Sequence, residues 1–132
     1  MPLEYMNWYT KQLIRSNPDK FYIFGDNFAE RGLGGQAREA RGEPNSIGIY
    51  TKRYSSYNEN AFLKDSDLPE WKSLTVPRLT LVLNVLQNNK IIVWPLAGIG
   101  TGLAELDKRA PLIMDELRGW IDRFLEYETK SK

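Results

Sequence analysis

The sequence predicts an α/β protein, a three-layer α/β/α fold with a mixed, partly parallel central sheet. Short apolar runs at residues 21–24, 47–51 and 91–94 have the length and composition of buried strands. Helix-compatible stretches separate these runs, and strands that alternate with helices form sheets that are at least partly parallel and covered on both faces. Glycine-rich segments follow the first and third runs directly. Because such sheets bind ligands beyond the carboxyl ends of their strands, the fold also predicts where the site lies.

The first half of the chain is expected to contain two helices and two strands. Residues 5–15 are predicted to form a short amphipathic helix, ended by the turn signal Asn17-Pro18-Asp19. Residues 21–24 form a continuous apolar run, which predicts a buried strand that stops at Gly25-Asp26-Asn27. A helix is expected over residues 37–41, and a second strand over residues 47–51.

The second half is expected to contain two long helices around one strand. Residues 55–70 are polar and rich in turn residues, which predicts a long loop. A helix is expected over residues 71–87, and Pro77 either kinks it or marks its true start. The strand at residues 91–94 leads through a glycine loop to a helix over residues 106–127. One face of that helix is apolar and carries Ile113, Leu117, Trp120, Ile121 and Phe124. A frayed tail is expected at residues 129–132.

Length and composition indicate a single domain over residues 1–132. Hydrophobic residues make up 42% of the chain, enough for one core. Eighteen Lys and Arg against 17 Asp and Glu give a net charge of +1, without the basic excess of nucleic-acid binders, so we expect no nucleic-acid partner. The N-terminus does not resemble a signal peptide, and no apolar run approaches the ~20 residues that span a bilayer. We therefore expect a cytoplasmic protein without a membrane partner.

The chain contains no cysteine and no histidine. This excludes disulfides, thiol nucleophiles, zinc sites built from Cys or His, and histidine general bases. We expect no metal site and no cofactor. From composition alone, catalysis would depend on carboxylates, hydroxyls, Lys, Tyr, backbone amides or a hard metal ion.

Two glycine-rich segments are the main functional clue. We call residues 32–36 the first glycine segment and residues 98–103 the second glycine segment. Glycine allows positive φ angles and close approach of a ligand to the backbone, so successive N–H groups can point at one anion. The alternative is that these glycines only form turns. Neither segment matches the G-x-G-x-x-G or P-loop patterns, which disfavours an ordinary Rossmann dehydrogenase or a kinase.

Polar and aromatic side chains near these segments allow more than one interpretation. Asp26, just past the first strand, either accepts a hydrogen bond from an exocyclic amine such as that of adenine or caps a turn. Lys52, at a strand end, is a candidate nucleophile if its pKa is lowered, or else a solvated or phosphate-pairing lysine. Glu105 is a candidate acid/base partner, or a carboxylate that stabilises a helix N-terminus. Tyr54 and Tyr57 lie on the polar loop and could stack on a base or ribose.

Four short motifs occur in an order that resembles the macrodomain family. They are Phe24-Gly25-Asp26-Asn27, Arg31-Gly32-Leu33-Gly34-Gly35-Gln36-Ala37, Ile49-Tyr50-Thr51-Lys52 and Pro95-Leu96-Ala97-Gly98-Ile99-Gly100-Thr101-Gly102-Leu103. They are most similar to the branch that contains the terminal ADP-ribose protein glycohydrolase, and to small macrodomain-like proteins of phages. The resemblance spans residues 21–115 and implies a macrodomain-like fold that binds ADP-ribose.

The resemblance also implies a role for each motif. Asp26, with Asn27 beside it, would contact the adenine amine. The first glycine segment would line the distal ribose with Gly32, Leu33, Gly34, Gly35 and Gln36. The second glycine segment would wrap the diphosphate with Gly98, Ile99, Gly100, Thr101, Gly102 and Leu103. In the glycohydrolase branch, a lysine that matches Lys52, next to Thr51, attacks the anomeric carbon of the distal ribose with help from an aspartate. That aspartate falls on Ala104 here, so Glu105 or the nearby Asp107 would have to replace it.

Three functions follow as alternatives. The first is an enzyme that hydrolyses an ADP-ribosyl linkage, as a glycohydrolase or an ADP-ribose phosphoesterase, with Lys52 and Glu105 as its catalytic groups. The second is a non-catalytic module that sequesters an ADP-ribose-type signalling nucleotide, in a phage as a counter-defence acting in the host cytoplasm. Ala104, in place of the aspartate, favours this second function. The third is a protein-interaction domain in which the glycines are only structural.

Overall fold

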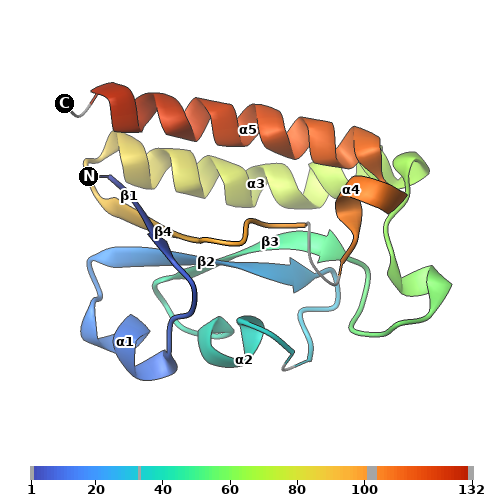
Figure 1. Ribbon diagram of the computed structural model, residues 1–132, viewed down its shortest axis with the longest axis horizontal. Helices are drawn as coiled ribbons and strands as arrows, with labels where there is room; N and C mark the ends of the chain where they lie inside the picture. The colour runs from blue at the N-terminus through green and yellow to red at the C-terminus, as the bar shows by residue number, and fades with distance from the viewer. Residues whose placement is uncertain (1, 33, 101–103, 131–132) are drawn as a thin grey trace.

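The computed structural model describes residues 2–32, 34–100 and 104–130 (Figure 1). Its strands are β1 (Leu3–Met6), β2 (Lys20–Asn27), β3 (Ser46–Lys52) and β4 (Ile91–Pro95). Its α-helices are α1 (Lys11–Ser16), α2 (Ala37–Ala40), α3 (Leu68–Gln87), α4 (Leu106–Arg109) and α5 (Pro111–Lys130). Two 3-10 turns, η1 (Glu59–Ala61) and η2 (Asp65–Asp67), precede α3.

The strands form one four-stranded sheet in the order β1-β4-β2-β3, and every strand pairing in the described chain is parallel. The carboxyl ends of β2 and β3 therefore lie at the same edge of the sheet. Their register runs from Tyr22 opposite Ser46 to Asn27 opposite Lys52. This register places two of the predicted site residues, Asn27 and Lys52, side by side.

All three predicted strands form, and β2 extends further than the sequence indicates. We expected residues 25–27 to stop it, but Gly25, Asp26 and Asn27 continue the strand. Each of these residues has a partner on β3, with a register shift between Asp26 and Asn27. Pairing with a neighbouring strand thus outweighs the turn preference of this sequence.

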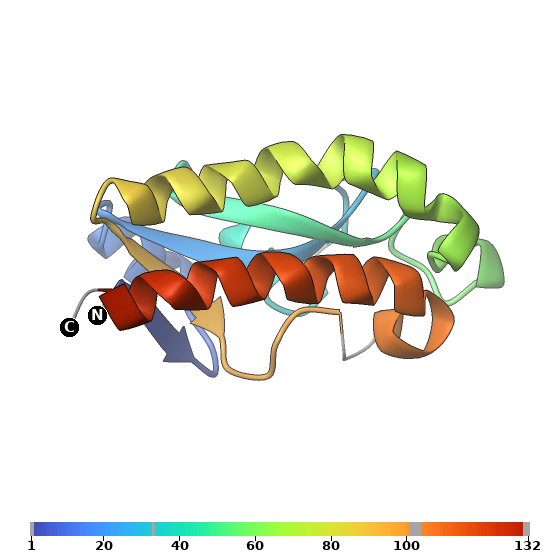
Figure 2. The same cartoon turned by 90° about the horizontal axis from the view of Figure 1, so that it is seen from above.

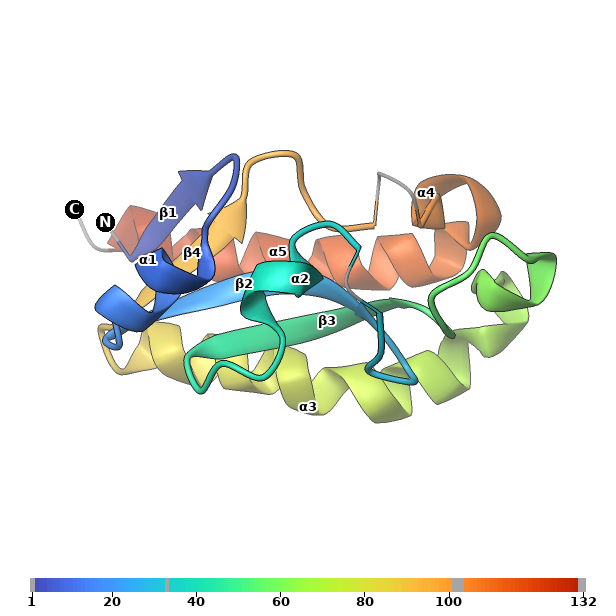
Figure 3. The same cartoon turned by 90° about the horizontal axis from the view of Figure 1, so that it is seen from below.

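Helices cover both faces of the sheet, which confirms the predicted three-layer α/β/α fold. The long helices α3 and α5 lie side by side on one face, and the short helices α1 and α2 lie on the other (Figures 1, 2 and 3). Each interface has its own core. The larger core contains, among others, Ile23, Ile49, Trp71, Leu79, Ile92, Ile113 and Phe124. The smaller contains Tyr9, Ile14, Tyr22, Phe24, Ala37, Ala40 and Val93.

The N-terminal segment differs from its prediction. In place of a helix over residues 5–15, the chain forms the edge strand β1, which pairs with β4, and then the shorter helix α1. Thr10 fixes the start of α1, because its hydroxyl oxygen accepts a hydrogen bond from the N–H of Leu13 at 3.1 Å. Tyr9 lies before the helix and is completely buried. The apolar residues that suggested one helix are therefore divided between β1, the connection and α1, and they pack together in the smaller core.

The helix after the polar loop begins three residues earlier than residue 71. Residues 55–67 form the predicted loop, which contains η1 and η2, and α3 starts at Leu68 with Pro69 in its first turn. Proline is favoured there because its missing N–H would have no partner in the helix. Pro77 lies inside α3 and does not mark its start.

The predicted C-terminal helix is divided into α4 and α5. Ala110, with φ −143° and ψ 65°, separates them, because the residue before a proline is disfavoured in the α conformation. The apolar face expected on the longer helix is confirmed: Ile113, Leu117 and Phe124 are buried, and Trp120 and Ile121 pack against them. α5 continues to Lys130, beyond the predicted start of the tail at residue 129. In the described part of the chain, we find no helix with the length and apolar character needed to span a membrane.

Candidate functional site

The described residues of both glycine segments line one cleft at the carboxyl ends of β2, β3 and β4. The cleft has a volume of about 550 Å³. The predicted site residues that line it are Asp26, Asn27, Gly32, Gly34, Gly35, Gln36, Thr51, Lys52, Gly98, Ile99 and Gly100. Four others, Leu33, Thr101, Gly102 and Leu103, lie outside the described residues. The segments that were predicted to act together therefore face the same space.

The glycines of the first glycine segment serve different purposes. Gly32 has φ +99°, and a Cβ atom there would lie 2.7 Å from the hydroxyl oxygen of Ser55, so glycine is needed for packing. A Cβ atom on Gly34 would have no heavy atom within 4 Å. Gly35 has φ +56° and is equally open. Gly34 and Gly35 therefore expose their backbone to the cleft, while Gly32 fixes the segment against the polar loop.

The backbone of this segment can still donate hydrogen bonds to a ligand. Among the described residues, the N–H groups of Gly34, Gly35 and Gln36 donate to no other backbone group. The helix that follows, α2, has only four residues, so its dipole adds little to anion binding. The side-chain amide of Gln36 is occupied, since it accepts from the N–H of Tyr9 at 3.0 Å and donates to the carbonyl of Tyr9 at 2.7 Å. Gln36 thus contributes its main chain to the cleft.

Asn27 shapes the turn that leads into the first glycine segment. Its side-chain amide donates to the carbonyl of Arg31 at 2.7 Å, and its backbone carbonyl accepts from the N–H of Glu30 at 2.9 Å. Glu30 has a left-handed φ of 52°. Thr51, on the neighbouring strand, donates its hydroxyl to the carbonyl of Asp26 at 3.3 Å. Both Asn27 and Thr51 are buried, so at the cleft wall they act first as structural supports.

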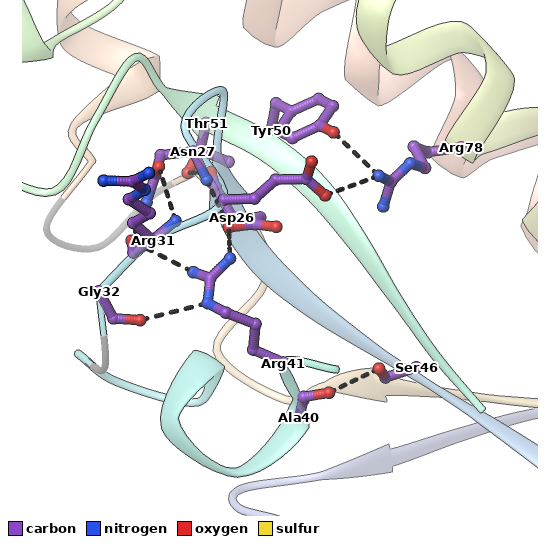
Figure 4. A network of polar contacts seen from close by, with 11 residues as sticks. Asp26, Asn27, Arg31, Gly32, Ala40, Arg41, Ser46, Tyr50, Thr51 and Arg78 are labelled. Atoms are coloured by element: carbon purple, nitrogen blue, oxygen red, sulfur yellow. Dashed lines mark hydrogen bonds and ion pairs between the residues drawn. The ribbon is translucent and has the colours of Figure 1, made fainter. Parts of the chain in front are cut away.

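Asp26 forms a buried ion pair that the sequence did not indicate. Its carboxylate lies 2.7 Å from the guanidinium of Arg41 and accepts the N–H of Asn27 at 2.8 Å (Figure 4). Burial raises the pKa of Asp26 above its usual value, and the hydrogen bonds from Asn27 and Arg41 oppose this shift. Gly48 on β3 leaves room for the pair, because a Cβ atom there would lie 2.9 Å from a carboxylate oxygen of Asp26.

Arg41 also holds the first glycine segment. Its guanidinium donates to the carbonyl of Gly32 at 3.2 Å and to the carbonyl of Arg31 at 3.4 Å. It lies over the ring of Phe24, 5.9 Å from the ring centroid. Arg41 therefore links the end of β2 to the loop above it, and Figure 4 shows these bonds converging on its guanidinium.

The second glycine segment is held by packing against the helix that follows it. Gly98 and Gly100 have φ values of +86° and +87°. A Cβ atom on Gly100 would lie 2.9 Å from a methyl group of Leu106, and the carbonyl of Gly100 accepts from the N–H of Leu106 at 2.7 Å. Gly100 thus fixes α4 directly beside the cleft.

Lys52 lines the cleft in a partly desolvated position. Its amine donates a hydrogen bond to the carbonyl of Ser56 and lies 4.5 Å from the ring centroid of Phe62 and 5.4 Å from that of Tyr57. Burial lowers the pKa of Lys52 below its usual value; the guanidinium of Arg109 lowers it further, while the carboxylate of Glu105 raises it. The lowered pKa increases the fraction of the amine that is neutral, which is the form that can act as a nucleophile.

Glu105 does not line the cleft among the described residues, although its neighbour Ala104 does. Glu105 adopts a left-handed conformation, with φ 48°, at the start of α4, and its carboxylate lies 3.5 Å from the guanidinium of Arg109. Asp107 is also absent from the cleft wall. The carboxylate predicted to assist Lys52 is therefore engaged with Arg109.

Several residues of the cleft wall were missed by sequence reasoning. Arg31 is exposed and lines the cleft. Arg41 and Ser56 also line it and are partly buried. Arg31 stands directly before the first glycine segment, in a motif that the sequence does mark, but we predicted no role for it. Nothing in the local sequence marks Arg41 and Ser56, because their positions depend on contacts between separate segments. Of the two tyrosines considered for stacking, Tyr57 lines the cleft and is 77% exposed, whereas Tyr54 is not part of the wall.

Comparison with known proteins gives a family for the chain. The model of a family of unknown function, DUF7831, matches residues 4–120, which include both glycine segments, Lys52 and Arg109. No curated protein and no solved structure matches the chain. Since the family model covers most of the sequence, the protein belongs to DUF7831.

Proposed function

We propose that the protein binds ADP-ribose or an ADP-ribose-derived nucleotide in the strand-end cleft and hydrolyses an ADP-ribosyl linkage. The observation that carries the proposal is that both glycine segments and Lys52 line the same cleft. Its volume of about 550 Å³ is in the range of small-molecule sites. The resemblance of the motifs to macrodomains supports this choice of ligand.

The cleft offers suitable groups for a diphosphate. Backbone N–H groups at Gly34 and Gly35 are available among the described residues, and glycine lets phosphate oxygens approach closely. The exposed guanidinium of Arg31 could pair with one phosphate in a bidentate manner. Tyr57 stands at the wall with most of its ring in solvent and could stack on a base or ribose.

The hydrolytic step is assigned to Lys52. Its neutral amine would attack the anomeric carbon of the distal ribose, forming a C–N bond while the glycosidic bond breaks and its electron pair leaves with the departing group. The proton lost from the alkylated nitrogen would pass to the departing group. Water would then attack the anomeric carbon, the C–N bond would break with its electron pair on nitrogen, and a proton from the water would restore the amine as ADP-ribose is released. The lowered pKa of Lys52 supports this role, because only the unprotonated amine has a lone pair for the attack.

A non-catalytic binder is the second candidate, and one observation favours it. Ala104 stands at the cleft wall, while the carboxylate of Glu105 pairs with Arg109. Asp26, the carboxylate among the described wall residues, is paired with Arg41. With no free carboxylate in the described wall to assist the leaving group or activate water, the protein would hold the nucleotide intact. It would then act by sequestering a signalling nucleotide.

The two candidates are separated by incubating the protein with an ADP-ribosylated peptide and with free ADP-ribose, followed by mass spectrometry and calorimetry. We expect Lys52→Ala to slow hydrolysis by about 100-fold or more, the scale of losing a group that takes part in the reaction. The affinity of Lys52→Ala for ADP-ribose should differ from that of the wild-type protein by less than about tenfold. Glu105→Ala tests the second predicted group. Lys72→Ala, a surface lysine paired with Glu116, is the control.

Hydrolysis by Lys52→Ala at the wild-type rate would contradict the role of Lys52. If the wild-type protein binds the nucleotide tightly and returns it unchanged after long incubation, it is a binder and not an enzyme. Absence of binding by the wild-type protein would reject both candidates.

A further inference from the structure

Two cationic side chains pack on one buried aromatic ring beside the cleft. Phe62 is 4% exposed, and its ring centroid lies 4.5 Å from the amine of Lys52 and 3.8 Å from the guanidinium carbon of Arg109. An isolated antiparallel bridge between Lys52 and Phe62 fixes the ring relative to the end of β3. Each cation is attracted to the ring, but the two repel one another.

Arg109 is held in this position from two sides. Its guanidinium lies 2.8 Å from the carboxylate of Glu59 in η1 and 3.5 Å from that of Glu105. The helix α4 that carries Arg109 is in turn fixed to the second glycine segment through Leu106 and Gly100. Because an arginine stays protonated in proteins, Arg109 places a permanent positive charge beside Lys52.

The other groups that face Lys52 define its surroundings. They are the carbonyl of Ser56, which accepts a hydrogen bond from the amine, the rings of Tyr57 and Phe62, and the carboxylate of Glu105. The hydrogen bond, the rings and the carboxylate favour the ammonium form, while Arg109 and burial favour the neutral amine. The ratio of neutral amine to ammonium at Lys52 therefore depends on whether Arg109 remains in place.

We propose that Arg109 is a positioning residue for Lys52: packed on the ring of Phe62, it places a positive charge beside the amine and makes that amine more reactive. The functional meaning of this inference rests on the proposed role of Lys52. The reactivity of the amine itself is a property of the protein without any nucleotide, so it can be measured separately.

The test is competitive labelling of the folded protein with acetic anhydride across a pH series, with the modification of each lysine followed by mass spectrometry. Lys72 serves as the internal reference in every sample. We expect Arg109→Gln to slow labelling of Lys52 at pH 7 by about threefold or more relative to Lys72, because less of the amine is neutral. Arg109→Lys should restore much of the wild-type rate, since it keeps the positive charge. Arg118→Gln, an exposed arginine paired with Asp115 on α5, should leave Lys52 unchanged.

A second variant predicts an effect of opposite sign and keeps the test decisive if Arg109→Gln does not fold. Glu105→Gln removes the negative charge near Lys52, so labelling of Lys52 at pH 7 should become faster. Unchanged labelling of Lys52 in folded Arg109→Gln, or slower labelling in Glu105→Gln, would overturn the inference. If labelling responds as expected but no ADP-ribosyl linkage is cleaved, the proposed hydrolysis fails and the role of Arg109 stands.

Discussion

At the scale of single residues, Asp26 has a different environment from the one its sequence position suggested. It was predicted either to contact an adenine amine or to cap a turn. Its carboxylate instead pairs with Arg41, and Arg41 in turn holds the carbonyls of Arg31 and Gly32. We therefore interpret the pair as an internal support for the first glycine segment, whether or not Asp26 also contacts a ligand.

This interpretation predicts a large loss of stability in Arg41→Gln. The Asp26 side chain is only 2% exposed and that of Arg41 20%, so removing the arginine leaves a buried carboxylate without its counter-ion. We expect the free energy of unfolding to fall by about 3 kcal/mol, measured by urea denaturation. Arg38→Gln is the matched control, because Arg38 pairs with Glu39 at the surface; it should change stability by less than about 0.5 kcal/mol. Equal effects of the two substitutions would contradict the interpretation.

The raised pKa of Asp26 also predicts a pH dependence of stability. Because its pKa is higher in the folded protein than the value near 3.9 in an unfolded chain, the folded state binds the proton more tightly. The stability contributed by protonated Asp26 is therefore present in acid and is lost as the pH rises from about 4 through the folded pKa. Urea denaturation from pH 4 to 7 should show wild-type stability declining relative to Asp26→Asn over this window. If the stability of the wild-type protein minus that of Asp26→Asn stays constant or increases with pH, the pKa of Asp26 is not raised.

Some site residues could be predicted from the sequence and others could not. The glycines, Asp26 and Lys52 follow apolar strand runs, so their places at strand ends follow from local pattern. Arg41 and Arg109 act through partners 15 and 50 residues away in the chain, Asp26 and Glu59. Such contacts leave no local signal.

At the scale of secondary structure, the buried strands were predictable and the helix boundaries were not. Continuous apolar runs identify β2, β3 and β4, because helices cover both faces of this parallel sheet. The boundary between α4 and α5 depends on Pro111, and the start of α1 depends on the Thr10 cap. Apolar periodicity continues across both points, so it suggests helices that are too long.

The two glycine segments predict contrasting effects of adding one methyl group. In Gly34→Ala the new methyl enters open space at the cleft wall, so stability should change by less than about 0.5 kcal/mol, while affinity for ADP-ribose falls by about tenfold. In Gly100→Ala the methyl meets Leu106 at a left-handed φ, which should cost about 1–3 kcal/mol. Thermal unfolding and calorimetry measure the two quantities. Loss of stability in Gly34→Ala with unchanged affinity would indicate a purely structural glycine.

At the scale of the whole molecule, the parallel sheet brings separate functional elements together. The sheet order places β2 between β4 and β3, so the segments that follow β2 and β4 leave adjacent strands at the same edge. The helices on the two faces give each side of the sheet its own core, which supports the strand ends from both sides. The predicted fold thus placed the two glycine segments correctly, while the details of the cleft wall required the tertiary contacts.

The central claim, that both glycine segments bind one nucleotide, is tested most directly by following backbone amide NMR signals while ADP-ribose is added. We predict saturable shifts that are largest at Gly34, Gly35, Gly98 and Gly100, with smaller changes at the end of β3. Shifts concentrated elsewhere, such as the groove beside Leu68 and Val76 on α3, would contradict the account. So would an unchanged spectrum at millimolar ADP-ribose.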